Sequence, residues 1–197
     1  MESNHWDPLG WKEVFKKLNL EAPPGGVSFF IKPPEGVNRL DGNMRLCEML
    51  KRSHEGDAFY ADPENHTCDA GLYIMGKDVP SVYTTGEYGA GLQIFNHTRV
   101  ARKIYDFIPK FDPESNISYV AFSPLDKLTF DPDLLVLVAQ VDQTEILLRA
   151  MSYLTGNNRP LPLLPIHGQW QWHIPALQDS KLQTMKAWSP MTRLLLM

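Results

Sequence analysis

The strongest constraint on the fold lies at residues 134–139, where the apolar sequence Leu-Leu-Val-Leu-Val-Ala runs without a break. The run is far shorter than the roughly 20 residues of a membrane-spanning helix, and its valines favour a strand. Successive side chains of a strand point to opposite faces of a sheet. The run therefore predicts a buried central strand that other parts of the chain cover on both faces.

Apolar periodicity and turn residues divide the rest of the chain into alternating helices and strands. Helices are predicted where apolar residues recur every three or four positions, at 11–18, 43–52, 100–108 and 142–155. Asp142 and Glu145 have the spacing of a capping box at the start of the last one. Strands are predicted at 27–31, 58–60 and 117–122. The alternation favours a single α/β or α+β domain, a mixed sheet with helices packed on it.

Residues 1–157 are predicted to form this domain, and residues 158–197 are different in kind. The sequence 159–165 is rich in proline, and 169–175 holds two tryptophans outside any recognisable pattern. The loss of periodicity after Asn158 motivates two hypotheses, a lineage-specific tail or a change of reading frame. An apolar tail could also cover a neighbouring subunit, which would make the protein a homo-oligomer.

Composition disfavours several classes of partner. The chain has 19 Lys and Arg against 23 Asp and Glu, for a net charge of −4, so no positive excess is available for a phosphate backbone. Two cysteines are too few for a disulfide scaffold, and the first residues lack the basic and apolar regions of a secretory leader. We therefore expect a soluble, cytoplasmic protein that binds neither nucleic acid nor membranes.

The segment with the clearest chemical potential is His66-Thr67-Cys68. An imidazole and a thiolate two residues apart can bind one metal ion, and folding could add Cys47 as a third ligand. The same pair suits catalysis, with Cys68 as nucleophile or redox thiol and His66 as base. Two cysteines cannot hold a four-thiolate iron–sulfur cluster, but a dimer could supply four. The sequence leaves these alternatives open.

The two cysteines have different expected environments. Cys47 falls in an apolar stripe with Met44 and Leu50, which favours a buried structural residue. Cys68 has polar neighbours, which favours an accessible thiol in a loop or at the first turn of a helix. The amide dipoles of such a helix and a protonated His66 would stabilise its thiolate. Cys68 is therefore expected to be the more reactive of the two.

A glycine-rich stretch, Thr-Gly-Glu-Tyr-Gly-Ala-Gly at 85–91, is a second candidate site. Its backbone amides could hold an anion or a cofactor. The stretch lacks the lysine and serine of a Walker loop, so a flexible turn is the competing interpretation. The residues of this candidate cofactor site are Gly86, Gly89, Gly91 and Arg99.

Several blocks, in their order along the chain, resemble domain-of-unknown-function family 169, an uncharacterised group associated with archaea and anaerobic bacteria. These blocks are Gly26-Val27-Ser28-Phe29, Pro34-Glu35-Gly36, Leu46-Cys47-Glu48-Met49-Leu50, Phe59-Tyr60, Asn65-His66-Thr67-Cys68-Asp69-Ala70-Gly71, Asp131-Pro132-Asp133, and Gln143 with Leu147, Ala150, Met151 and Tyr153-Leu154-Thr155-Gly156. The resemblance covers about residues 6–157 and is most specific at 47–71. The resemblance implies that the chain shares the fold of this family, and it implies no particular reaction. It also implies further cysteines and a terminal strand after residue 158, which the sequence does not show in recognisable form.

The leading hypothesis is a cytosolic domain of anaerobic metabolism that binds a small ligand, a metal ion or a cofactor, with Cys68, His66 and Cys47 at the site. One alternative is a thiol-dependent or redox enzyme that uses Cys68. Another is a non-catalytic protein that acts through oligomeric interactions. Whether the protein is an enzyme is left open by its sequence.

Overall fold

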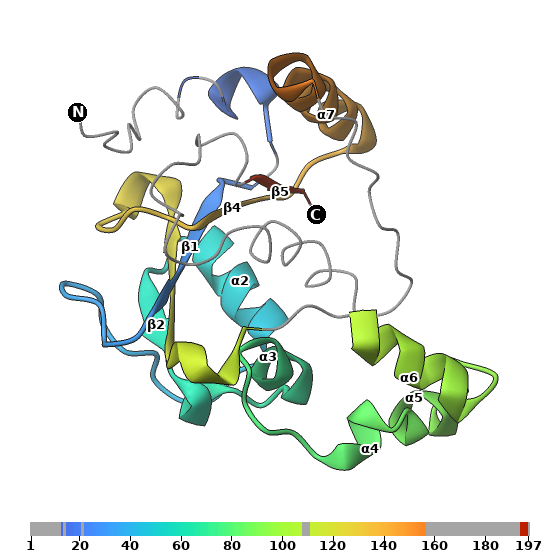
Figure 1. Ribbon diagram of the computed structural model, residues 1–197. Coiled ribbons are helices and arrows are strands. Elements are labelled where there is room, and N and C mark those ends of the chain that lie inside the picture. Colours follow the sequence, from blue (N-terminus) through green and yellow to red (C-terminus); the bar gives the residue numbers. More distant parts are fainter. Residues whose placement is uncertain (1–12, 14, 21, 108–110, 157–193, 197) are drawn as a thin grey trace.

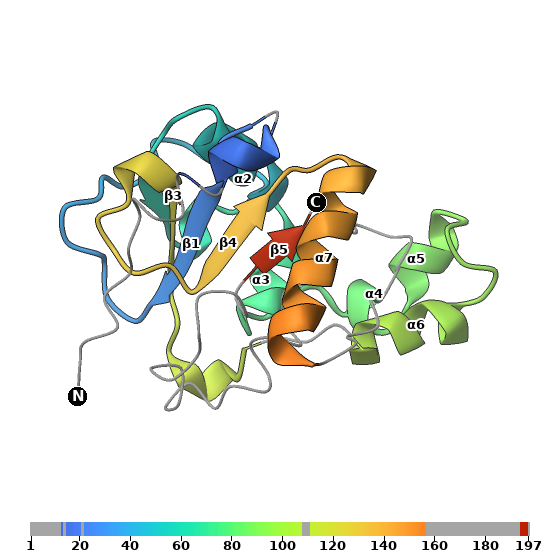
Figure 2. The same ribbon diagram turned by 90° about the horizontal axis from the view of Figure 1, so that it is seen from above.

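The main element of the protein is a five-stranded sheet with the strand order β2-β3-β1-β4-β5 (Figures 1 and 2). The computed structural model describes residues 13, 15–20, 22–107, 111–156 and 194–196. The strands are β1 (Gly25–Phe30), β2 (Phe59–Ala61), β3 (Tyr119–Pro124), β4 (Leu134–Leu137) and β5 (Leu194–Leu196). Neighbouring strands are antiparallel except β4 and β5, which are parallel. The predicted α+β fold with a mixed sheet is confirmed.

Helices lie against the sheet and beside it. They are α2 (Leu46–His54), α3 (Asp69–Ile74), α4 (Ser81–Thr84), α5 (Glu87–Gly91), α6 (Thr98–Phe107) and α7 (Val141–Thr155), with 3-10 turns η1 (Pro63–Asn65), η2 (Pro113–Ser115) and η3 (Leu125–Lys127). Residues 13 and 15–18, the N-terminal helical segment, are also helical. Helices α4, α5 and α6 pack on one another at the side of the molecule (Figure 1). None of the described helices is both long and apolar enough to span a membrane.

Strand β4 is buried on both faces, as its apolar sequence predicts. Leu134 and Val136 belong to the larger core cluster, to which α2 also contributes. Leu135 and Leu137 belong to a second cluster with Phe15 of the N-terminal helical segment and a leucine of η3. Because these residues alternate along the strand, the two clusters lie on opposite faces of the sheet. β4 therefore has a cover on each side.

The expectation that Cys47 is a core residue is wrong. Helix α2 begins at Leu46, and its buried residues are Leu46, Met49, Leu50 and Ser53. Cys47 lies one position after Leu46, which turns it by about 100° around the helix axis. Its side chain is consequently exposed. The spacing of the buried residues along the helix was predicted correctly, but their positions were displaced by one residue.

A carboxylate fixes the connection that leads into β4. Asp133 Oδ2 accepts hydrogen bonds from the Ser28 hydroxyl at 2.6 Å and from the Phe29 backbone amide at 2.9 Å. A side chain at Gly26 would not fit here, since its Cβ would lie 2.7 Å from Leu128 Cδ2 and 3.1 Å from Pro132 Cβ. Two blocks that carry the family resemblance, 26–29 and 131–133, thus meet in the fold and support each other.

Helix α7 is capped differently from the prediction. Its N-cap is Gln140, whose backbone amide donates to Gln143 Oε1 at 2.8 Å, so the cap lies two residues before Asp142. Gln143 Nε2 also donates to the backbone carbonyls of Leu18 and Asn19, at 2.9 and 3.0 Å. One glutamine therefore ties the start of α7 to the end of the N-terminal helical segment.

The predicted buried stripe of α7 is only partly found. Leu147 is half-buried, but Ala150 is exposed, which corrects that part of the prediction. The side chains of Met151 and Leu154 lie outside the described residues, as does most of the predicted tail. The tail does contribute β5, a terminal strand that extends the sheet beside β4. The two hypotheses on the origin of the tail stay predictions.

Candidate functional site

The segment that carries His66 is held in an extended conformation by a parallel bridge to Met44. The Met44 amide donates to the Asn65 carbonyl at 2.8 Å, and the Thr67 amide donates to the Met44 carbonyl at 3.1 Å. Met44 lies two residues before α2 begins. These bonds therefore place the His66 segment beside the start of α2.

A buried amide side chain fixes this arrangement. Asn65 is 3% exposed, and its Nδ2 donates to the carbonyls of Leu40 and Gly42 at 3.2 and 2.7 Å. Its Oδ1 accepts from the Asp62 amide at 3.1 Å. The sequence pattern does not single out Asn65 because its two carbonyl partners lie more than twenty residues earlier. The available local signal was the Asp-x-x-Asn spacing, which forms a capping box around η1.

An ion-pair group lies next to this amide. Arg39 contacts the carboxylates of Asp62 at 2.7 Å and Glu64 at 2.9 Å. The hydrogen bond to Asp62 is the largest of the causes that raise the pKa of Arg39. Asp62 acts to raise the pKa of the neighbouring His66, and burial of the imidazole outweighs this influence.

His66 is the least satisfied polar side chain in this region. It is 7% exposed, and neither ring nitrogen has a hydrogen-bond partner among the described residues. Burial lowers the pKa of His66 to about 4, against the opposing influence of Asp62. The imidazole is therefore neutral near pH 7, and the predicted stabilisation of the Cys68 thiolate by a protonated His66 is wrong. An unpaired buried polar group costs about 1–3 kcal/mol.

Cys68 lies on the same side of the extended segment as His66. Backbone angles are φ −87° and ψ 125° at His66 and φ −120° and ψ 110° at Cys68. Side chains at positions i and i+2 of an extended chain share a face, about 6.6 Å apart along it. Exposure follows this alternation, with His66 buried, Thr67 exposed and Cys68 half-buried. One metal ion can bridge side chains at this separation.

The first turn of α3 packs over the imidazole. A Cβ at Gly71 would lie 3.4 Å from His66 Nδ1 and 3.2 Å from Leu46 Cδ2, so the absence of a side chain permits this close approach. Leu46 is the first residue of α2, and Cys68 is the N-cap of α3. The fold thus brings together the segments that carry His66, Cys68 and Cys47.

The predicted order of thiol accessibility is wrong. Cys47 is exposed, whereas Cys68 is half-buried between the extended segment and α3. Within the described part of the chain, no group of three or more His, Cys, Asp or Glu side chains could hold a metal ion. Cys47 therefore does not complete a three-residue site with His66 and Cys68 within the described part of one chain.

The glycine-rich stretch forms helix α5, so its interpretation as a flexible turn is wrong. Gly86 is its N-cap with φ +84°, and a Cβ there would collide with the Thr98 carbonyl and lie 2.6 Å from the Arg102 amide nitrogen. Gly89 packs in the same way against Phe95 and Ala101. Close packing of α5 on α6 explains these two glycines.

The predicted anion site gains no support from this arrangement. The Gly86 amide donates to the Tyr83 carbonyl at 3.1 Å, so it is already engaged. Gly91 faces open space, and Arg99 is exposed on α6. The role of Gly86, Gly89, Gly91 and Arg99 in cofactor binding stays a prediction.

Comparison with known proteins gives one family and one relative. The model of domain-of-unknown-function family 169, described as Uncharacterised ArCR, matches residues 14–166. The chain is 33% identical over 126 residues to the uncharacterized protein MJ0308 of Methanocaldococcus jannaschii. The aligned region covers 62% of this chain and 53% of that protein. The chain therefore spans about half the length of the curated relative it matches. No solved structure matches it.

The packing explanation for the glycines predicts opposite effects at two positions. Gly86→Ala should lower the free energy of unfolding by about 2 kcal/mol or more, because of its positive φ and the contact with α6. Gly91→Ala, with open space at its Cβ, should be neutral or stabilising by up to about 1 kcal/mol. Urea denaturation of both variants measures the difference. Equal destabilisation would contradict close packing at Gly86.

Burial of His66 predicts a specific loss of stability in acid. Its pKa is about 4 in the folded chain and about 6.5 when unfolded, so the unfolded state binds more protons between these values. The free energy of unfolding should fall by about 2–3 kcal/mol more in the wild type than in His66→Gln between pH 7 and 4.5.

Urea denaturation at both pH values, in buffer with a chelator, measures this contribution. His97→Gln, at an exposed histidine whose Nδ1 accepts from the Arg99 amide, is the control for the loss of one imidazole and should keep more of the wild-type pH dependence than His66→Gln. If His66→Gln also kept it, the imidazole would not be held neutral by burial.

Proposed function

The chain belongs to domain-of-unknown-function family 169, and we propose that it is a metal-binding or cofactor-binding domain whose ligands are His66 and Cys68. The observation that carries this proposal is the buried imidazole of His66, whose two ring nitrogens have no hydrogen-bond partner within the described part of the chain. A bound metal ion would use one of them and compensate part of the cost of burial. The neighbouring thiol on the same face supplies a second ligand.

The protonation state of His66 favours this role. Metal ions bind the neutral imidazole, and its pKa of about 4 means that no proton competes for the ring near pH 7. Binding through Cys68 would release the thiol proton, so affinity should rise with pH. Imidazole and thiolate together suit a borderline ion such as Zn²⁺ or Co²⁺.

Two protein ligands leave coordination positions open. Zinc commonly has four ligands, so water, a small molecule or groups from a second copy of the chain would fill the rest. A small ligand bound directly to the ion would make this a cofactor site of the kind expected from the sequence. An anaerobic and cytoplasmic setting remains part of the proposal.

A thiol enzyme is the second candidate function. It is favoured by the position of His66, two residues from Cys68 on one face of the segment, and it would require the pKa of about 4 to rise before the imidazole could accept the thiol proton. An iron–sulfur cluster shared across a dimer would instead use Cys47 and Cys68 from both copies. An oligomeric interaction protein, the third alternative, requires neither thiol.

Titration with Co²⁺ under anaerobic conditions tests the metal site. The wild type should develop the absorption of a thiolate-bound cobalt ion, with one ion per chain. Cys68→Ser and His66→Gln should each weaken binding by about tenfold or more. Cys47→Ser is the matched control and should bind as the wild type, because Cys47 is exposed and its loss should change stability by less than about 0.5 kcal/mol.

Other outcomes separate the alternatives. Equal loss of binding in Cys47→Ser and Cys68→Ser would replace the proposed site with one shared by both thiols. No cobalt binding by the wild type would overturn the metal proposal. Alkylation of Cys68 that slows in His66→Gln would then support the thiol enzyme.

A further inference from the structure

Helix α7 carries the two most exposed large apolar side chains of the described residues. Tyr153 is 89% exposed and Val141 is 88% exposed, and Ile146 on the same helix is 55% exposed. Figures 1 and 2 show α7 at the outside of the molecule, beside β5. Isolated apolar residues are ordinary on a protein surface, but several on one side of a helix are typical of an interaction surface.

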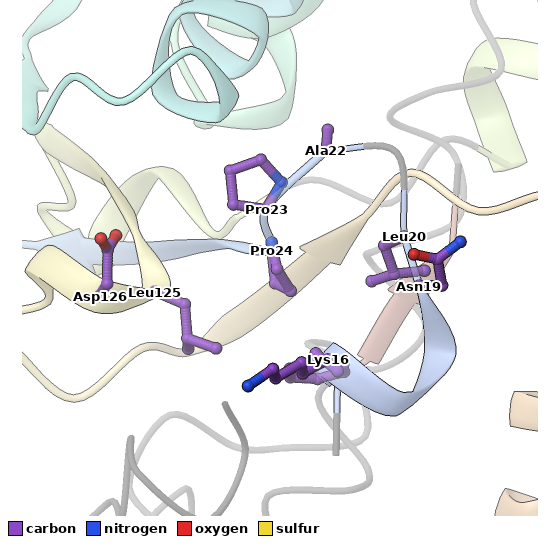
Figure 3. A pocket seen from close by; sticks show the side chains of 9 residues that line it. Lys16, Asn19, Leu20, Ala22, Pro23, Pro24, Leu125 and Asp126 are labelled. Atoms are coloured by element: carbon purple, nitrogen blue, oxygen red, sulfur yellow. The ribbon is translucent and has the colours of Figure 1, made fainter. Parts of the chain in front are cut away.

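The opposite side of α7 is fixed to the rest of the protein. Leu147 is half-buried there, and Gln143 Nε2 donates to the carbonyls of Leu18 and Asn19 at 2.9 and 3.0 Å. Asn19 and Leu20 stand at the end of the N-terminal helical segment, where they line a groove of about 420 Å³ (Figure 3). The helix is therefore anchored on one side, and its exposed side is free to contact a partner.

The exposed side of α7 has a self-complementary order of side chains. Val141, Glu145, Arg149 and Tyr153 follow one another at intervals of four residues, so they form a single row along the helix, the α7 row. Glu145 and Arg149 form an ion pair at 3.5 Å and are 68% and 78% exposed. From its start to its end the row is apolar, acidic, basic and apolar. If the row is reversed, apolar residues face apolar residues and the acidic residue faces the basic one.

We propose that the α7 row binds the α7 row of a second copy of this chain, with the two helices antiparallel about a two-fold axis at the level of residue 147. Val141 then lies against Tyr153 of the partner subunit, and Glu145 lies against Arg149 of the partner subunit. Both pairs are placed symmetrically about residue 147, so one arrangement satisfies them together. Rows of this kind align when two helices cross at about 50°, the commonest class of helix packing.

The charges of α7 support a second copy as the occupant. Its charged residues are Asp142, Glu145 and Arg149. In the two-fold arrangement Asp142 lies opposite Ser152 of the partner subunit, so like charges do not face each other. A partner with a uniformly acidic or uniformly basic surface would instead be repelled by one of the charges in the row. The dimer does not depend on the metal site proposed above.

Analytical ultracentrifugation of the full chain tests the dimer. A single pair of helices is smaller than a standard interface of about 800 Å² per partner, so we expect a weak dimer with a dissociation constant of about 1–100 µM. Tyr153→Ser should weaken self-association by about tenfold or more, because each dimer loses the same apolar contact twice.

Exchange of charges separates contact between two chains from the ion pair within one helix. Glu145→Arg makes both charges of the row basic, and Arg149→Glu makes both acidic, so a homodimer of either variant brings like charges together. Each variant alone should self-associate about tenfold or more weakly than the wild type. An equimolar mixture of the two variants should form a heterodimer about as strongly as the wild type dimerises, because a basic row then meets an acidic one.

The matched control is Lys51→Glu on α2, where Lys51 and Glu55 form an exposed pair of the same kind at 3.7 Å. This variant should self-associate as the wild type does, and circular dichroism reports whether each variant keeps its helices. A monomeric wild type would overturn the proposal. Unchanged self-association in both α7 charge variants, or a mixture that associates no better than its two components, would also overturn it.

Discussion

The fold depends on strand β4, whose successive side chains are apolar and must be covered on both faces of the sheet. Helix α2 contributes to the cluster on one face, and the N-terminal helical segment with η3 contributes to the cluster on the other. The cover on the face of α2 also carries the candidate site. His66 and Cys68 lie beside the start of α2. The candidate site therefore rests on the packed core.

The candidate metal site combines a buried imidazole, which destabilises the fold, with hydrogen bonds that hold the surrounding backbone in place. Burying His66 without a partner destabilises the protein, while Asn65 holds the adjoining segment through three hydrogen bonds. Gly71 allows α3 to pack over the imidazole. A structure that supports an unsatisfied polar group in this way is typical of functional sites, where the cost of the arrangement is offset elsewhere.

Sequence periodicity predicted most elements but not their phase or their long-range contacts. The helix near Cys47 was expected, yet its buried face runs through Leu46, Met49 and Leu50, which leaves Cys47 on the surface. The role of Asn65 depends on carbonyls distant in sequence, and β5 is recognisable only by its pairing with β4. The burial of His66 could not be predicted, because its sequence neighbours are polar and its cover comes from α3 and α2. The placement of Cys68 on the same face as His66 could be expected from their spacing, since residues two apart in an extended chain share a face.

X-ray absorption at the zinc edge, on protein loaded with one Zn²⁺ per chain, tests the central claim most directly. The proposed site predicts one sulfur at about 2.3 Å and one imidazole nitrogen at about 2.0 Å from the ion, with oxygen or nitrogen atoms in the other positions. The sulfur should disappear in Cys68→Ser and remain in Cys47→Ser. A first shell without sulfur in the wild type, or sulfur retained in Cys68→Ser, would contradict the assignment of the site to His66 and Cys68.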